Sequence, residues 1–290
     1  MQPIIQSKRK MLAKVIALTL LWAIPWLFLH GDLYQSWLVN KYTESTAFVV
    51  EIVLSFLSII VFEIGFLYLL VKRERIKDFR KYFKIERLDT RGIWLGLELG
   101  LLLQVINVAF LGKVLLEPAK NFLLELGIPG PQIGLSTGEI IPHLSPPQAM
   151  FLSVFLILFW WLEVPEELFF RGYLQNQMQE VFGKNTALFL SALVWALAHL
   201  WGLANTLERF LYGCVYAFVF RMRQNTTGTM IDHPLGNRSL LLGFTLPQII
   251  GIQLDPHGSS AWILVAVVYV ALILLVIKGW HVLKLDRKTM

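Results

Sequence analysis

Long apolar runs, separated by short polar or basic segments, dominate the chain. A helix that crosses a bilayer needs roughly 20 residues, so the length of the chain accommodates up to eight such helices with short loops. Spans are predicted at approximately 11–29, 46–71, 92–116, 148–164, 185–203, 207–221, 229–252 and 260–281. The pattern therefore predicts an all-α fold, a polytopic transmembrane bundle of about eight helices.

The composition agrees with this pattern. Of the 290 residues, 56% are apolar and only 16% are charged, against about 25% charged residues in soluble domains. The single cysteine, Cys214, lies in an apolar segment, so neither a disulfide framework nor a thiolate zinc site is available. The run at 11–29 is not followed by a small-residue cleavage site, which favours a retained helix over a signal peptide.

Basic residues are distributed unevenly among the loops. They concentrate at 72–91 and at both termini, whereas loops 30–45 and 117–147 hold one each, Lys41 and Lys120. This is the positive-inside pattern, and it predicts that both termini are cytoplasmic. Because the net charge of +6 follows this topology, nucleic acid is not an expected partner. The compact loops favour a bacterial plasma membrane over an endoplasmic reticulum.

Adjacent acids are the most unusual feature of these spans. Glu166 and Glu167 follow Pro165 at the end of a long apolar run, and carboxylates at membrane depth are costly unless they are paired, hydrated or functional. Pro165 indicates either a helix start or a kink in a continuing helix. In both cases Glu167 and Arg171 share one helical face as an expected ion pair. Glu166 points about 100° away, which leaves a second carboxylate for other chemistry.

Two histidines lie in later apolar segments. His199 ends SALVWALAHL, and Trp195 lies four residues earlier on the same helical face. His233 and Asn237 share a face if their segment is helical, whereas Pro234 favours a helix that begins only at residue 234. An Asn amide and a neutral His each supply an N–H that can stabilise an oxyanion. The acids and histidines together predict an intramembrane polar site that activates water.

The remaining acids and a search for other hydrolase motifs do not alter the prediction of a polar site built from these acids and histidines. Glu163, Glu51, Glu63 and Glu98 are interpreted as interfacial or bundle-interior polar contacts. The sequence contains no Gly-x-Ser-x-Gly elbow, no His-Glu-x-x-His helix and no glycine-rich phosphate loop. Intramembrane hydroxyls such as Ser191 have no histidine at a telling spacing, so a serine nucleophile is disfavoured.

The order and spacing of the polar residues resemble the three motifs of the CPBP (Abi) family, the CAAX-protease and bacteriocin-processing intramembrane proteases, which include the Rce1-type prenyl-protein endoproteases. The motifs are Glu166-Glu167-x-x-x-Arg171, Trp195-x-x-x-His199 and His233-x-x-x-Asn237. The resemblance covers roughly residues 148–240. This chain has Trp195 where the family usually has Phe, and it carries Pro234 inside the third motif.

The resemblance implies a bundle of helices with a site that opens towards the cytoplasm, and a membrane-associated protein or peptide substrate, with or without a prenyl group. It assigns Glu166 as the base that activates water, His199 as the residue that shares this water, His233 and Asn237 as oxyanion donors, and Glu167, Arg171 and Trp195 as supporting residues. No cofactor is expected. The alternative is zinc held by Glu166, His199 and His233.

Three parts are predicted along the chain. Residues 1–147 hold the first membrane helices and a basic cytoplasmic loop, residues 148–252 form the catalytic core, and residues 253–290 hold the last helix and a basic tail. The basic segment 72–91 is either an interfacial amphipathic helix or a loop that only sets topology. The span at 229–252 is rich in Gly and Pro, which suits backbone that lines a wet cavity.

Two other function classes stay open. A non-proteolytic scaffold, or a bacteriocin-immunity-type protein, could retain the same polar core, and substitution of Glu166 or His199 would then leave the phenotype unchanged. A proton-coupled carrier would also use carboxylates and histidines. Carriers often show paired repeats in their two halves, and the sequence shows none, so this class ranks last.

Overall fold

The structure is a computed structural model that describes residues 2–29, 40–86, 144–199 and 202–234, together with positions 122, 237, 245, 248–249 and 274. No strand occurs among these residues, which confirms the all-α prediction. The predicted span 92–116 and most of the spans 229–252 and 260–281 lie outside the described residues, so the eight-helix bundle and its three-part division stay predictions.

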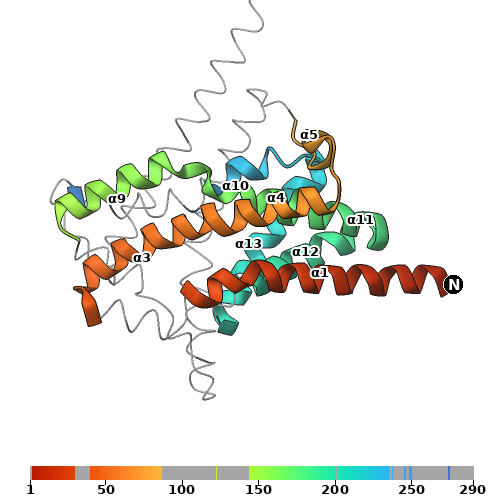
Figure 1. Cartoon of the computed structure of the whole chain (residues 1–290), viewed down its shortest axis with the longest axis horizontal. Helices are drawn as coiled ribbons and strands as arrows, with labels where there is room; N and C mark the ends of the chain where they lie inside the picture. Colours follow the sequence, from red (N-terminus) through yellow and green to blue (C-terminus); the bar gives the residue numbers. More distant parts are fainter. Residues whose placement is uncertain are drawn as a thin grey trace, which may run out of the picture.

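The described residues are mostly helical (Figure 1). In chain order the helices are α1 (Gln2–Leu29), α3 (Glu44–Ser58), the π-helix η1 (Ile59–Glu63), α4 (Ile64–Arg73), α5 (Phe79–Tyr82), α9 (Pro146–Leu158), the 3-10 helix η4 (Trp160–Glu163), α10 (Val164–Glu167), the π-helix η5 (Leu168–Gln175), α11 (Asn176–Phe182), α12 (Lys184–Ala198) and α13 (Gly202–Arg223).

One long apolar helix is formed by α3, η1 and α4, which run on continuously in Figure 1. The stretch Ser45–Arg73 has 29 residues and is long and apolar enough to cross a membrane, as predicted for 46–71. Its π-helical turn holds the Glu63 side chain in a buried position. Lys72 and Arg73 end the helix, where cations complement the negative end of the helix dipole.

The predicted span 148–164 is not one straight helix. α9 ends at Leu158, and the following helical stretch, Trp160–Phe182, leaves it at an angle of 53°. Pro165 accounts for the break, because a proline ring clashes with the carbonyl four residues earlier and cannot donate to it. The short 3-10 helix η4 takes the place of that turn, and Pro165 lies in the first turn of α10. Of the two interpretations of Pro165, the structure therefore has the helix start.

The helices α12 and α13 pack side by side with an unusually close approach. A Cβ atom at Gly213 would lie 2.9 Å from Cε3 of Trp195 and 3.1 Å from Cα of Ala192, so only glycine fits there. The two helices agree with the predicted spans 185–203 and 207–221, but the connection comes earlier, because α12 already ends at Ala198.

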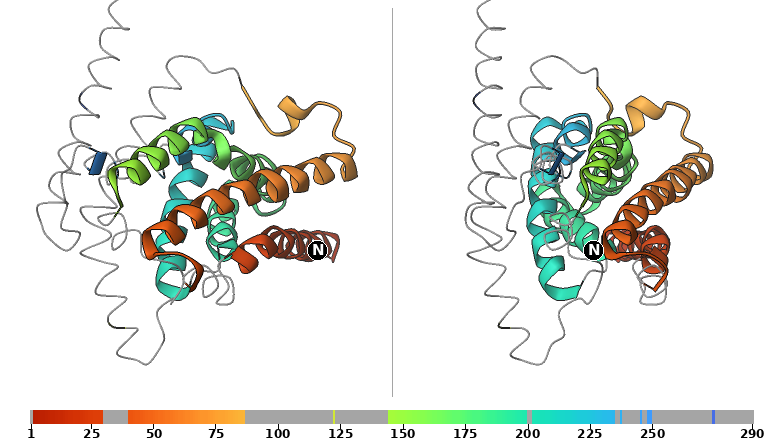
Figure 2. Two further views of the ribbon diagram at one scale, coloured as in Figure 1. Left: turned by 60° about the vertical axis from the view of Figure 1, so that its left-hand side comes forward. Right: turned by 90° about the vertical axis from the view of Figure 1, so that its left-hand side faces the viewer.

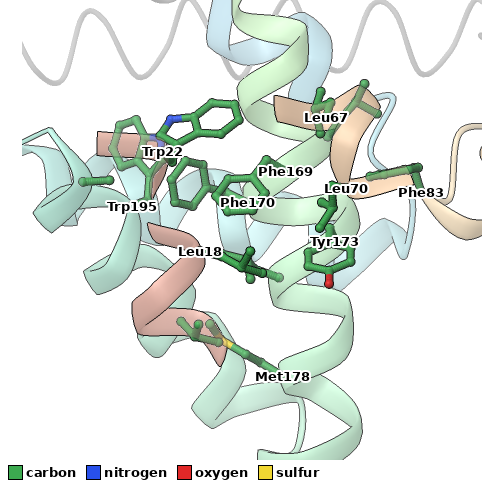
Figure 3. Close-up of a cluster of buried hydrophobic side chains, with 14 of the residues drawn as sticks. Leu18, Trp22, Leu67, Leu70, Phe83, Phe169, Phe170, Tyr173, Met178 and Trp195 are labelled. Carbon is green, nitrogen blue, oxygen red and sulfur yellow. The ribbon is translucent and has the colours of Figure 1, made fainter. Parts of the chain in front are cut away.

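An aromatic layer joins α1 and α4 to η5 in the apolar core (Figure 3). The ring of Trp22 stacks on Phe169, with centroids 4.6 Å apart and planes at 11°. Phe66 meets the same ring edge-on at 5.0 Å. Each such pair contributes about 0.5–1.5 kcal/mol beyond the buried area. Because Phe169 lies only two residues after Glu167, the aromatic layer holds the helical stretch that carries both acids in place.

The basic segment after α4 is mostly irregular and lies at the far end of that helix (Figure 2). Within the described part, 72–86, the only helical turn beyond α4 is α5, which Asp78 caps through the backbone N–H of Lys81 at 3.0 Å. A long amphipathic helix is thus not formed there. A contact of 2.9 Å between Lys14 Nζ and Glu74 Oε1 places the N-terminal part of α1 at the same end.

Candidate active site

The adjacent acids Glu166 and Glu167 lie in the single turn of α10 and are both buried. Residues next to each other on a helix diverge by about 100°. The two carboxylates accordingly face different partners: Glu166 faces α12, and Glu167 faces Arg171 and the segment that carries His233. The 53° change of helix direction before α10 points Glu166 and Glu167 towards the interior of the protein.

Glu166 lies beside Trp195 of α12 and His199, the residue that caps the C-terminus of this helix. The indole Nε1–H of Trp195 donates a hydrogen bond to Glu166 Oε1. The Nε2 atom of His199 lies 3.6 Å from the same oxygen. Trp195 and His199 are four residues apart, so the helix presents both to one carboxylate, and their rings meet edge-on at 4.6 Å. The predicted Glu166, Trp195 and His199 are therefore brought together.

A backbone contact fixes the orientation of the His199 ring. Its Nδ1 atom lies 2.8 Å from the carbonyl oxygen of Trp195. A carbonyl only accepts, so Nδ1 must carry the proton of this hydrogen bond. In the neutral ring, Nε2 then carries the lone pair and points towards Glu166. Nε2 of a neutral His199 and Oε1 of Glu166 are then both hydrogen-bond acceptors. The distance of 3.6 Å between these two atoms is too long for a direct hydrogen bond.

Glu167 is held by two cationic or polar donors at once. Its Oε1 accepts from Arg171 Nη1 at 2.9 Å and lies 2.8 Å from Nδ1 of His233. The spacing-based prediction of a Glu167–Arg171 pair agrees with this contact. The Arg171 guanidinium also lies over the rings of Trp195, at 5.0 Å, and Tyr216, at 5.3 Å. Through these contacts Glu167 connects η5 to the segment that carries His233.

His233 is packed between aromatic rings. It stacks on Tyr216 of α13, with centroids 4.7 Å apart, and meets Trp195 edge-on at 5.6 Å. Residues 229–234 are helical, so the alternative in which a helix begins only at Pro234 is wrong. A proline is tolerated where the hydrogen bond of its own N–H is not needed, and His233 keeps its helical conformation.

Asn237 has a partner that the sequence did not suggest. Its Nδ2 atom lies 3.5 Å from Oε1 of Glu163, a long contact, and its side chain is half-buried. No contact of Asn237 with His233 is seen among the described residues. Glu163, interpreted above as structural, thus lies next to a predicted site residue.

Sequence reasoning missed two residues that shape the site. Tyr216 supplies the ring under His233, and Gly213 supplies the space for Trp195. Both lie on α13, three residues apart and therefore on one helical face. Their spacing alone carries no chemical signal, because glycines and tyrosines are common in membrane helices. Only the packing of α12 on α13 reveals their position.

The alternative zinc ligands are not gathered into one cluster. Among the described residues, no group of three His, Cys, Asp or Glu side chains is close enough to share a metal ion. His233 contacts Glu167 rather than Glu166. A set of Glu166, His199 and His233 would therefore need His233 to leave its present partner.

Comparison with known proteins identifies the region that carries this site. Residues 148–238 match the family model of type II CAAX prenyl endopeptidase Rce1-like proteins. No curated protein and no solved structure matches the chain. The family match agrees with the resemblance read from the three motifs, and it covers α9 through the segment with His233.

Proposed function

We propose that the protein is a glutamate-dependent intramembrane endopeptidase that hydrolyses a peptide bond of a membrane-associated protein or peptide. The family match supports an endopeptidase of integral membrane type at the level of the family. The observation that carries the mechanism is the buried Glu166 carboxylate, fixed by Trp195 and set 3.6 Å from His199 Nε2.

The proposed reaction begins with a water molecule that donates hydrogen bonds to Glu166 Oε1 and His199 Nε2. Two acceptors that do not bond each other suit one such donor. As the water oxygen attacks the scissile carbonyl carbon, its proton passes to Glu166, and the carbonyl electron pair becomes an oxyanion. Collapse of this tetrahedral species breaks the C–N bond, and Glu166 returns the proton to the leaving amine.

The oxyanion needs donors that are already in place. His233 is the proposed donor through its Nε2–H, because its other ring nitrogen, Nδ1, is engaged by Glu167. Asn237 is the second proposed donor, and its long contact with Glu163 leaves it free to turn towards a substrate. Arg171, through Glu167, keeps His233 oriented.

The experiment combines activity and metal content on purified full-length protein. Quenched peptides with prenylated and unprenylated C-termini are offered to the wild type, to Glu166→Ala and to the control Glu51→Gln, another buried acid in a membrane helix. We expect cleavage that is lost in Glu166→Ala and kept in Glu51→Gln, without stoichiometric zinc.

Zinc at one ion per chain that disappears with Glu166→Ala would replace this mechanism by a metalloprotease. Equal cleavage by the wild type and Glu166→Ala would contradict the proposal. Failure to cut any peptide would favour the scaffold class.

A further inference from the structure

A groove between α1 and α4 has no role in the proposed hydrolysis. It has a volume of about 470 Å³, within the range typical of ligand sites. Its walls include Leu18, Trp22 and Pro25 of α1 and Gly65, Phe66 and Leu69 of α4. We refer to it as the α1–α4 groove. Since α4 belongs to the membrane-capable stretch Ser45–Arg73, the exposed rim of the groove faces lipid.

The polarity of the groove is asymmetric along its length. Arg73, the last residue of α4, lies in its lining. Exposed basic residues continue directly after it, at Arg75, Lys77, Arg80 and Lys81. The other charged lining residue, Glu63, is ten residues earlier, or about 15 Å along a helix. The groove is thus apolar along most of its length, and Arg73 lies at the end that is nearest to one membrane interface.

We propose that the α1–α4 groove binds an anionic phospholipid, with one acyl chain lying along the wall formed by Trp22 and Phe66 and the phosphate against Arg73. The apolar walls match an alkyl chain, and the guanidinium matches a phosphate through two parallel hydrogen bonds. Glu63 lies too far along the helix to oppose the phosphate. The neighbouring basic residues attract anionic lipid to this interface.

The α1–α4 groove and the aromatic layer next to the candidate active site share two residues, Trp22 and Phe66. Trp22 and Phe66 line the groove and contact Phe169 at 4.6 and 5.0 Å. Figure 3 shows the Trp22 and Phe169 rings in this layer. Phe169 lies three residues after Glu166 on the same helical stretch. A bound acyl chain therefore supports the helix that carries the acids, and this regulatory consequence rests on the proposed function.

Lipid binding is measured directly, without any use of activity. Native mass spectrometry of the full-length protein in detergent, titrated with phosphatidylglycerol or phosphatidylcholine of the same acyl chains, gives the two affinities. The wild type is expected to prefer phosphatidylglycerol by about tenfold, the value of one charge-assisted contact. Arg73→Gln should remove the preference, whereas the control Lys184→Gln, at an exposed cation of α12 outside the groove lining, should keep it.

A second pair of variants tests the acyl-chain site. A Cβ at Gly65 would meet no atom within 4 Å, so Gly65→Leu fills the groove without displacing its walls. It should reduce binding of both lipids about tenfold, since several buried methylene contacts are lost. Ile64→Phe adds bulk to the neighbouring residue, which is not in the lining, and should leave binding unchanged.

The proposal is overturned by equal affinity of the wild type for the two lipids, by a loss as large in the controls as in the groove variants, or by no bound lipid. Displacement of phosphatidylglycerol by a farnesylated peptide would overturn it in favour of a substrate-tail site. None of these outcomes depends on catalysis, so each is distinct from failure of the proposed protease function.

Discussion

Glu166 and Glu167 are neighbours in one helical turn, yet their surroundings differ. Oε1 of Glu167 accepts a hydrogen bond from Arg171 and contacts Nδ1 of His233, so two segments fix the position of this carboxyl group. Glu166 has one fixed donor, Trp195, and faces the lone-pair nitrogen of His199. The comparison teaches that two neighbouring acids of one turn can be given different surroundings, which is the condition that the proposed division into a supporting acid and a general base requires.

The largest effect on the surroundings of Glu167 is expected from Arg171→Met, which removes its ion-pair partner. Removing one partner of a buried ion pair leaves the other charge uncompensated, which costs about 3–5 kcal/mol of stability. Thermal unfolding in detergent would show this as a large fall in Tm. The double variant Arg171→Met/Glu167→Leu should recover part of the loss, because neither charge then remains buried alone. A double variant less stable than Arg171→Met would contradict the assigned role.

The surroundings of Glu166 are tested by Trp195→Phe. This change keeps an aromatic wall, as in the usual family motif, but removes the N–H that donates to Glu166. We expect kcat to fall roughly 10–100-fold, corresponding to one hydrogen bond to a charged group. Trp161→Phe, at an exposed tryptophan of η4, is the control and should leave kcat unchanged. Full activity of Trp195→Phe would mean that the indole does not position Glu166.

Glu74 differs from the two buried acids because its side chain is partly exposed, and a smaller effect is expected from its ion pair with Lys14. Burial raises its pKa, but hydrogen bonds from Lys14 and Tyr173 outweigh burial and leave the pKa below its ordinary value of 4.5. A lowered folded-state pKa stabilises the protein above pH 4.5 and ceases to do so as the pH falls through the folded value.

The contribution of such a partly exposed pair is below about 1 kcal/mol. The Tm of the wild type should therefore fall slightly more than that of Glu74→Gln when the pH is lowered through this range. An equal fall in both proteins would show that the Lys14–Glu74 contact adds no stability.

Sequence spacing predicted the parts of the site that depend on a single helix. The Glu167–Arg171 and Trp195–His199 pairs are four residues apart, and helical geometry alone brings such residues together. The contacts of Glu166 with α12 and of Glu167 with His233 join distant segments. Only the order of the three motifs, through the family resemblance, pointed to them.

Features that depend on three-dimensional packing were not predictable. The predominantly apolar run 148–164 has no periodic signal that would locate the break at Phe159, although Pro165 indicated that one was near. The π-helix η5 shifts the residues after Glu167 relative to an α-helix, and sequence carries no marker for it. Tyr216, Gly213 and the Asn237–Glu163 contact likewise follow from tertiary packing.

The most direct test measures cleavage and Tm together for the wild type, Glu166→Gln and Glu167→Gln. Each variant replaces a carboxyl group by an amide and keeps the side-chain shape. The account predicts that Glu166→Gln keeps the Tm and loses at least about 10²–10⁴-fold in kcat, the usual contribution of a general base. Glu167→Gln should instead lower the Tm. A Glu166→Gln protein that cleaves at the wild-type rate, or that unfolds as readily as Glu167→Gln, would contradict the division of roles between the two acids.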